Sequence, residues 1–406
     1  MNLVFSDITN KNNFLCYDDF LHWKEHFYFH NYVEGVYKNA NFYSIDNIPS
    51  DKFIFDLQFR FDQMFNNKLF DCESNEHILT YLDIPQIVKD RVRSGTAYFT
   101  VSLPTEAIFT QEGIDAMTRF FKGLGYPLKN IVYVTNSPNG QEVINSMSEN
   151  NDTISHVFYP TFLKDFQKKY PRNIVYQAAF NTLEKDFLCF NWNHHIHRLL
   201  FYVLMDKSEL IENSYYSLPS VGYRGEIDQA IFEKVDAKDL LRFKITKSDI
   251  ETAKNKLPKI LEPDFDHNQI NDSHSAPVFY RQSLVSVVTE TNFFSDAIHI
   301  TEKTFKPCSF EHPFVLLSSK GSLEYLHKLG FITFGKFWNE DYDKIADPID
   351  RMLRVVELCK TIHKWDIGKK RRFLNEVQPV LKHNKHRIKT LHEQGHMFTD
   401  IQKLAL

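Results

Sequence analysis

The feature that most constrains the fold is a repeated alternation of short apolar segments with stretches of helical periodicity. In the first half of the chain, strands are predicted at 53–57, 97–103, 130–135 and 154–159, and helices at 112–124 and 141–148. Strands that alternate with helices of about ten to fifteen residues are typical of βαβ units, which build parallel sheets. The first half is therefore predicted to fold around a parallel sheet.

The same alternation restarts close to Phe187. Strands are predicted at 186–190, 283–289, 314–318 and 331–334, and helices at 197–211, from Thr301 onward and at 322–329. Beyond residue 347 the chain is predicted to be mostly helical, whereas the first fifty residues are aromatic and irregular. The pattern predicts the α/β fold class, with two doubly wound domains at residues 1–180 and 181–406.

The composition is that of a globular protein. Among 406 residues, 37 Phe and 19 Tyr supply enough apolar surface to offset chain entropy, which excludes disorder as the main state. With 13 Gly and 15 Pro, collagen-like and linker-like chains are also excluded. The abundance of Phe, Tyr, Lys and Asn is compatible with an AT-rich genome and a viral source.

The cysteines, the N-terminus and the apolar runs indicate the compartment. Five widely spaced cysteines with no CxxC pair argue against a disulfide framework and favour a reducing compartment. Residues 1–7 lack the basic start and apolar core of a signal peptide. No apolar run approaches the roughly 18 residues of a membrane span. A cytoplasmic protein is expected, in the host cytoplasm if the source is viral.

Polar residues that follow the predicted strands are the first candidates for a binding site, because ligands of open parallel sheets lie beyond the carboxyl ends of the strands. Asn191 begins the turn after one strand, and Arg198 lies in the first turn of the next helix. Helix N-termini attract phosphate, and an arginine adds a bidentate donor. Two other interpretations stay open: a metal site on His194, His195 and His197, and a solvated helix start.

A second cluster follows a later strand. Glu290 ends a buried-type strand, and Glu302 and Lys303 begin the next helix. A carboxylate suits the two hydroxyls of a ribose, and a lysine suits a diphosphate. The alternative is helix capping, with Thr301 as the N-cap and Glu302 favouring the helix dipole. A Gly-Ser turn before the helix at 322–329 is a weaker phosphate candidate, because the chain has neither a P-loop nor a dinucleotide fingerprint.

Two sequence blocks of the second half carry a family resemblance. One is ITEKTFKP at 300–307, followed by HPFVLL, GSL, LGF and TF, and the other is FNWNHHIHRLLFYVL at 190–204. Over residues 185–345 the chain resembles the donor domain of fucosyltransferase-like glycosyltransferases, a family that includes viral and bacterial enzymes. The spacing of Glu290 from the TEK block reproduces the family pattern, in which a Glu-containing turn precedes a TEK helix start.

The resemblance implies a sugar-nucleotide-dependent glycosyltransferase of the GT-B type, with two Rossmann-like domains facing across a cleft. The nucleotide-diphosphate sugar would bind the C-terminal domain, and a hydroxyl-bearing acceptor, a glycan or another molecule, would lie across the cleft. By position, Arg198 and Lys303 would face the donor diphosphate. Glu302 would hold the ribose, Glu290 would contact the sugar, and Asn191 would lie in the donor-site turn.

The resemblance also implies inversion by direct displacement, with no metal or cofactor besides the nucleotide sugar. The family often has Asn after the first glutamate, where this chain has Thr291, so the donor sugar stays open. The acceptor hydroxyl needs a general base. Glu106, just after a predicted strand, is the predicted base, since related enzymes carry a carboxylate there. Asp83 and Glu25 are weaker candidates, and Glu106 also reads as a surface-loop glutamate.

The C-terminal segment is strongly basic. Residues 360–392 contain ten Lys and Arg against two acidic residues, a net charge of +8 in a chain whose total is −4. Such a segment suits DNA, an acidic glycan or a membrane surface, and it is equally typical of a solvated helix face. Two alternatives to a glycan-modifying enzyme therefore stay open. They are a viral-type DNA-base-modifying glycosyltransferase and a non-catalytic carbohydrate- or nucleic-acid-binding protein on the same fold.

Overall fold

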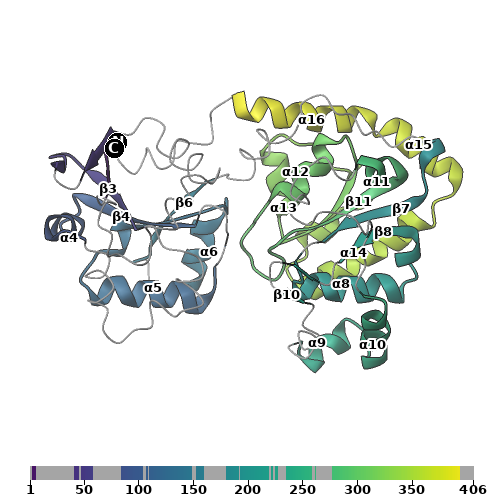
Figure 1. Cartoon of the computed structure of the whole chain (residues 1–406), viewed down its shortest axis with the longest axis horizontal. Coiled ribbons are helices and arrows are strands. Elements are labelled where there is room, and N and C mark those ends of the chain that lie inside the picture. The colour runs from purple at the N-terminus through teal and green to yellow at the C-terminus, as the bar shows by residue number, and fades with distance from the viewer. Residues whose placement is uncertain are drawn as a thin grey trace. The chain divides into compact units, whose positions relative to one another are not determined.

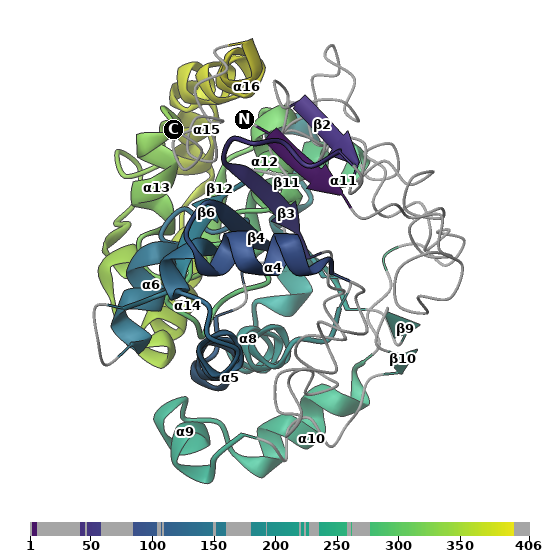
Figure 2. The ribbon, with the colours of Figure 1, turned by 90° about the vertical axis from the view of Figure 1, so that its left-hand side faces the viewer.

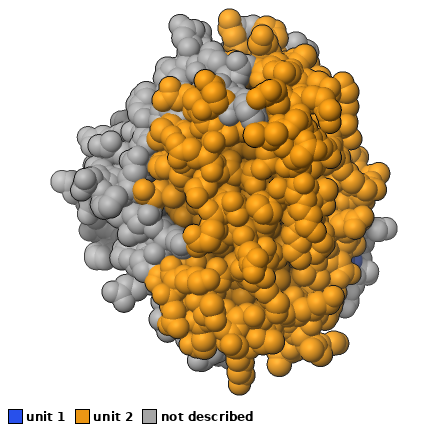
Figure 3. Space-filling view, turned by 90° about the vertical axis from the view of Figure 1, so that its right-hand side faces the viewer, with its two compact units in different colours: residues 1–165, 395–406 blue, residues 166–394 orange. Residues whose placement is uncertain are grey.

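In the computed structural model the chain divides into two compact units, residues 1–165 with 395–406 (unit 1) and residues 166–394 (unit 2, orange in Figure 3). The structure describes residues 2–5, 41–44, 47–57, 84–103, 107, 109–148, 152–159, 180–191, 193–218, 221–222, 225–226, 235–257, 261 and 277–393. Because 160–179 lie outside the described residues, the domain boundary between 180 and 181 stays a prediction.

Unit 1 is built on a six-stranded parallel sheet in the order β2-β1-β3-β4-β5-β6 (Figure 1). Its strands are β1 (Asn2–Phe5), β2 (Asn41–Ser44), β3 (Phe53–Asp56), β4 (Ala97–Leu103), β5 (Ile131–Thr135) and β6 (Ser155–Phe158). The helices described in this unit are α4 (Gln86–Arg93), α5 (Gln111–Gly123) and α6 (Gly140–Met147). Helix α4 lies against β4, as Figure 2 shows.

The core of unit 1 follows from its sequence pattern. Every residue of β5 is buried, as expected for a parallel strand with both faces covered. Helix α5 begins where the Thr110 hydroxyl accepts a hydrogen bond from the Gly113 N–H at 3.1 Å. Its apolar face, which includes Met117 and Phe121, is buried. The alternation of buried strands and one-sided helices therefore produces the covered sheet that the sequence predicts.

Unit 2 is built on a four-stranded parallel sheet in the order β12-β11-β7-β8. Its strands are β7 (Lys185–Phe190), β8 (Ser214–Ser217), β11 (Ser283–Thr289) and β12 (Phe314–Leu317), beside a small antiparallel pair of β9 (Val221–Gly222) and β10 (Gly225–Glu226). The helices described here are α8 (Ile196–Lys207), α9 (Ala237–Arg242), α10 (Lys247–Asn255), α11 (Pro277–Gln282), α12 (Glu302–Ser309), α13 (Ser322–Lys328), α14 (Pro348–His363), α15 (Ile367–Glu376) and α16 (Gln378–Glu393).

The strand order of unit 2 contains a reversal that determines where a ligand can bind. From β7 the chain moves to β8 on one side, and it later returns to β11 on the other side of β7. Ligands of open parallel sheets bind outside the carboxyl ends of the strands at such a switch point. The turns that follow β7 and β11 therefore lie at the edge where a site is expected.

The C-terminal helices are held to the rest of unit 2 by partly exposed basic side chains that pair with buried carboxylates. The Asp186 carboxylate, at the start of β7, accepts hydrogen bonds from Lys370 Nζ and, at 2.7 Å, from His363 Nδ1. Lys385 Nζ lies 3.0 Å from Oε1 of the buried Glu311. Figure 1 shows α16 running along unit 2 beside α12. None of the helices that the structure describes is long and apolar enough to cross a membrane.

The predicted α/β class with two Rossmann-like domains is confirmed, but several predicted elements need correction. The first fifty residues are not wholly irregular, because β1 and β2 lie within them, and β8 was not predicted. The helix predicted at 197–211 ends at Lys207, because Glu209 takes a left-handed conformation with φ 59°.

The strand predicted at 331–334 is absent from the described sheet. The backbone groups of Ile332 bond to the Asn384 side chain of α16 instead of to a strand. Oδ1 of Asn384 accepts the Ile332 N–H at 2.9 Å, and its Nδ2 donates to the Ile332 carbonyl at 2.8 Å. A side chain from a distant helix has thus taken the place of a neighbouring strand.

Candidate functional site

The predicted donor-site residues gather where β7 and β11 end. Asn191 follows β7 and is buried, and its Oδ1 accepts a hydrogen bond from the Thr289 hydroxyl at 2.5 Å, at the end of β11. The Asn191 N–H lies 3.2 Å from the Ser217 carbonyl oxygen and 3.1 Å from the Ser217 hydroxyl, at the end of β8. Asn191 therefore ties together the ends of three strands.

Arg198, in the first turn of α8, is a buried cation at this switch point. Its side chain is 1% exposed, with Nη1 donating to the Asn193 carbonyl at 3.1 Å and Nη2 to the Thr289 carbonyl at 3.0 Å. Burial lowers the pKa of Arg198, and the Glu290 charge opposes this shift. Its Nε has no hydrogen-bond partner in the described part of the chain. The guanidinium is thus fixed between two main-chain carbonyls.

Glu290 fixes the start of α12 to the end of β11. The residue is 0% exposed, and its Oε1 accepts hydrogen bonds from the Thr301 N–H at 2.9 Å and the Thr304 hydroxyl at 2.6 Å. Its Oε2 accepts a hydrogen bond from the Thr301 hydroxyl at 2.6 Å. A buried carboxylate is tolerated when it is hydrogen-bonded in this way and lies near a helix N-terminus.

Glu302 and Lys303 are the partly exposed members of the group. Thr301 caps α12, since its hydroxyl oxygen accepts the Lys303 N–H at 3.3 Å. Lys303 Nζ donates to Thr301 Oγ1 at 3.1 Å and to Glu302 Oε1 at 2.8 Å. The side chain of Lys303 is 29% exposed and that of Glu302 is 28% exposed, whereas Arg198 and Glu290 are buried. A ligand at the start of α12 can therefore reach this ion pair.

The ion pair controls the charge of Glu302. Burial, the largest single influence, raises the pKa of Glu302, but the Lys303 ammonium, the backbone N–H of Glu302 and the Lys306 charge together outweigh it and bring the pKa to about 2. Because this value lies below the ordinary 4.5, the ionised Glu302 makes its full contribution to the stability of the fold above about pH 4.5. That contribution is lost as the pH falls from 4.5 toward 2.

The three histidines after β7, His194, His195 and His197, do not form a metal-binding cluster. The His197 ring lies 5.4 Å from the Phe293 ring, and its Nε2 donates to the Glu290 carbonyl at 2.8 Å. Burial lowers the pKa of His197 to about 3, so the ring is neutral at physiological pH. The described residues contain no group of three or more side chains arranged to hold a metal ion.

The Gly-Ser turn before α13 has no open phosphate cradle. The buried Asp343 carboxylate accepts hydrogen bonds from the N–H groups of Leu323 at 3.0 Å and Glu324 at 3.3 Å. Asp343 thus occupies the donors that a phosphate would need, and its own charge would repel one. Gly321 is required at this turn because its φ is 81°.

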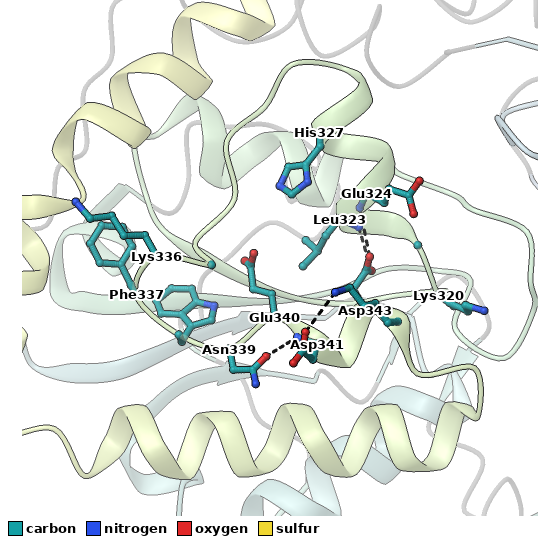
Figure 4. Close-up of a pocket in the computed structure, with 14 residues that line it drawn as sticks. Lys320, Leu323, Glu324, His327, Lys336, Phe337, Asn339, Glu340, Asp341 and Asp343 are labelled. Carbon is teal, nitrogen blue, oxygen red and sulfur yellow. Dashed lines mark hydrogen bonds and ion pairs between the residues drawn. The ribbon is translucent and has the colours of Figure 1, made fainter.

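A pocket opens at the same end of the sheet, between the start of α13 and residues 335–344 (Figure 4). Its volume is about 800 Å³, and its walls include Leu323, His327, Phe337 and Glu340. A volume of this order is typical of small-molecule sites. No local sequence pattern predicts this pocket, because its walls come from a helix and a loop that tertiary contacts bring together.

Glu106 is the predicted catalytic base. Glu106 and the weaker candidates Asp83 and Glu25 lie outside the described residues. The described strand that precedes Glu106, β4, is buried in the sheet of unit 1. The assignment of a base therefore stays a prediction.

The basic segment divides into cations with structural partners and cations on the surface. Lys370 and Lys385 pair with carboxylates of the unit, and Arg387 Nε donates to the Leu329 carbonyl at 2.6 Å. The cations of the segment that are exposed are Lys364, Lys369, Arg371, Arg372, Lys382 and Lys389. The exposed cations leave a basic surface on α15, α16 and the turn before them.

Sequence reasoning missed residues that hold the site from a distance. Thr304 binds Glu290, and Ser319, after β12, donates to the carbonyls of Ala297 at 2.9 Å and Asn292 at 3.3 Å. No local sequence pattern pairs Thr304 with Glu290. These contacts join segments that only the folded sheet brings together.

We predict that Lys303→Met raises the pKa of Glu302 well above about 2, because the nearest opposing charge is lost while burial still acts. A carboxyl ¹³C NMR titration of Glu302 measures this shift. Lys328→Met, which removes the partner of the exposed Glu324 on α13, is the matched control and should leave Glu302 unchanged. A Glu302 pKa that stays near 2 in Lys303→Met would show that Lys303 does not control this carboxylate.

The known proteins that this chain is similar to are distant from it. No family model matches the chain, and no curated protein matches it significantly.

Similar solved structures include the N-terminal domain of Candida albicans trehalose-6-phosphate phosphatase, with a TM-score of 0.45, 9% identity, and 99% of this chain and 96% of that chain covered. Another is the DNA-modifying enzyme β-glucosyltransferase, solved with and without uridine diphosphoglucose, with a TM-score of 0.39, 10% identity, and 100% and 99% covered. A third is a UDP-forming α,α-trehalose-phosphate synthase from Burkholderia vietnamiensis, with a TM-score of 0.40, 10% identity, and 88% and 73% covered. All three structures have TM-scores of 0.45 or less with this chain.

Proposed function

We propose that the protein is a glycosyltransferase that moves a sugar from a nucleotide-diphosphate donor to an acceptor hydroxyl. The observation that carries the proposal is the Glu302–Lys303 ion pair, partly exposed at the start of α12 and at the switch point of the unit 2 sheet. The resemblance of the surrounding TEK block to fucosyltransferase-like enzymes supports it. The nucleotide sugar is the co-substrate, and the proposal includes no further cofactor.

The two residues have the chemistry that such a donor requires. Lys303 Nζ uses two of its N–H groups on Thr301 and Glu302, which leaves the third for a diphosphate oxygen. Glu302 Oε2 is buried and has no hydrogen-bond partner among the described residues, so a turn of the partly exposed Glu302 side chain toward a ribose hydroxyl would satisfy it. The N-terminus of α12 adds a favourable field for the negative charge of the diphosphate.

We assign positioning roles to Asn191, Arg198 and Glu290. Their polar groups already hold the strand ends and the start of α12. The buried charge of Arg198 would stabilise charge that develops on the leaving diphosphate, because a fixed cation needs no reorganisation during the reaction. Direct contact of Arg198 with the diphosphate and of Glu290 with the sugar stay predictions.

The proposed reaction is a direct displacement with inversion. An acceptor hydroxyl oxygen forms a bond to the anomeric carbon while the bond from that carbon to the diphosphate oxygen breaks. The electron pair of the broken bond leaves with the nucleoside diphosphate, and the hydroxyl proton passes to the base, for which we propose Glu106.

We propose a cytoplasmic location, the host cytoplasm if the source is viral. Cys189, Cys308 and Cys359 are buried thiols with no disulfide, as expected in a reducing compartment. Burial raises the pKa of Cys189 to about 12, so this thiol stays protonated. The viral source rests on composition and on the family resemblance.

Lys303→Ala and Glu302→Ala should each weaken binding of the matching sugar nucleotide by about tenfold or more, because each removes a charge-assisted hydrogen bond. A thermal-shift screen of the wild type across sugar nucleotides identifies the donor, and calorimetry of the variants measures the loss. Lys360→Ala and Glu357→Ala remove an exposed pair of the same kind on α14 and serve as controls. Undiminished donor binding in both site variants would overturn the donor-site assignment. Donor binding without transfer to any acceptor would favour the non-catalytic alternative.

Glu106→Gln should lower kcat by about 10²- to 10⁴-fold while donor affinity survives, because the amide cannot accept the acceptor proton. Steady-state kinetics with the donor identified by the screen measure both quantities. Glu112→Gln, at an exposed position in the first turn of α5, is the matched control. Normal turnover in Glu106→Gln would remove this residue from the mechanism.

A DNA acceptor is the second candidate, favoured by the exposed cations of α15 and α16. If DNA binds there, raising the salt from about 50 to 200 mM should weaken duplex binding by about tenfold or more, because binding releases counterions from the DNA and added salt opposes that release. Fluorescence anisotropy measures this effect, and the Lys369→Glu and Arg372→Glu changes should mimic it at low salt. Lys238→Glu, an exposed change on α9, is the control. The absence of duplex binding at low salt would rule out this acceptor.

A further inference from the structure

The pocket between α13 and residues 335–344, here called the α13 pocket, has walls whose charges nearly cancel. Its charged lining residues are Lys320, Lys336, Lys344, Glu324, Glu340, Asp341 and Asp343. Lys344 Nζ lies 3.5 Å from Asp341 Oδ1, and Glu324 pairs with Lys328 at 2.9 Å. Carboxylates on several sides disfavour a phosphate-bearing ligand, and the lysines disfavour a cation. The lining therefore favours a neutral ligand.

Glu340 is a preorganised acceptor at the wall of this pocket. Its Oε2 accepts the Thr333 hydroxyl at 2.6 Å and its Oε1 accepts the Phe334 N–H at 2.8 Å. Each carboxylate oxygen has a second lone pair for a further donor. The adjacent Gly335 leaves room, since a Cβ there would lie 3.1 Å from Glu340 Oε2. Two protein donors thus hold the carboxylate in place without using its full capacity.

His327 is held by the same hydrogen bonds. The Thr333 hydroxyl has a single proton, which it donates to Glu340, so it must accept from His327 Nε2, 2.7 Å away. A neutral His327 therefore keeps its proton on Nε2 and presents Nδ1 as an acceptor. Figure 4 shows the His327 ring and the Glu340 carboxylate turned toward each other across the pocket. Both groups accept hydrogen bonds, which suits a ligand rich in hydroxyls.

The pocket also offers apolar surface. Leu323 is buried, Phe337 is half-buried, and Trp338 is buried against Phe334 and Phe373. Sugars have apolar C–H faces that pack on aromatic rings and hydroxyl edges that donate to carboxylates. We propose that the α13 pocket binds a neutral saccharide, at a place separate from the Glu302–Lys303 pair. This proposal does not depend on the proposed donor site.

The test is a binding screen of the full-length protein by saturation-transfer NMR and by intrinsic tryptophan fluorescence, which Trp338 in the pocket wall should report. The probes are glucose, galactose, mannose, N-acetylglucosamine, lactose and maltose, with glucose 6-phosphate and glucuronate as charged counterparts. We expect at least one neutral sugar to bind saturably and its charged counterparts to bind at least tenfold more weakly. Absence of saturable binding by every neutral probe, or tighter binding of the charged ones, would overturn the proposal.

Glu340→Gln should weaken saccharide binding at least tenfold. The amide N–H of the new side chain would donate to the Thr333 hydroxyl, which would then donate to His327 Nε2 and move the His327 proton to Nδ1. Long-range ¹⁵N NMR of the His327 ring detects that change of tautomer. His327→Ala, at an exposed position, is a second variant that should keep the fold and still weaken binding. Undiminished affinity in both variants would also overturn the proposal.

Two controls separate this pocket from the proposed donor site. Glu357→Gln, on the exposed side of α14, should leave saccharide binding unchanged. Lys303→Ala should weaken binding of the sugar nucleotide and leave binding of the saccharide unchanged. Glu340→Gln should weaken binding of the saccharide and leave binding of the sugar nucleotide unchanged. Loss of both ligands in Lys303→Ala would mean that the two sites are one and would contradict the proposal.

Discussion

The buried carboxylate of Glu290 is the interaction on which the rest of unit 2 depends. Its three hydrogen bonds to Thr301 and Thr304 fix the start of α12 at the end of β11. A carboxylate with no exposure is stable only when such donors replace water, so removing any of them would leave an unsatisfied charge in the interior. The position of the Glu302–Lys303 pair follows directly from this arrangement.

The site separates residues that build it from residues that a ligand can reach. Asn191 and Arg198 join the ends of neighbouring strands, and their hydrogen bonds end on protein groups. Glu302 and Lys303 lie one layer further out and keep bonding capacity. This separation explains how one motif can supply both the framework and the contacts of a binding site, with positioning residues buried beneath the contact residues.

The proposed donor site and the α13 pocket lie at one end of the same sheet. Ser319 and the buried Arg351 connect them, because both donate to carbonyls of the loop that leads from Glu290 to Thr301. The Arg351 Nη2 group donates to the Phe293 carbonyl at 2.8 Å, and its Nη1 donates to the Ile345 carbonyl at 2.6 Å. A parallel sheet collects such loops at its carboxyl edge, which is why two places for ligands can arise beside each other.

Periodicity and strand-end polarity are local signals, so they are enough to predict the α/β class, most strands and helices, and the turns that hold Asn191, Glu290 and Lys303. Which of these side chains are buried could be learned from the folded protein alone, since burial depends on partners distant in sequence. Asn384 replaced the strand predicted at 331–334 for the same reason. The α13 pocket was unpredictable because long-range packing, rather than local pattern, brings its walls together.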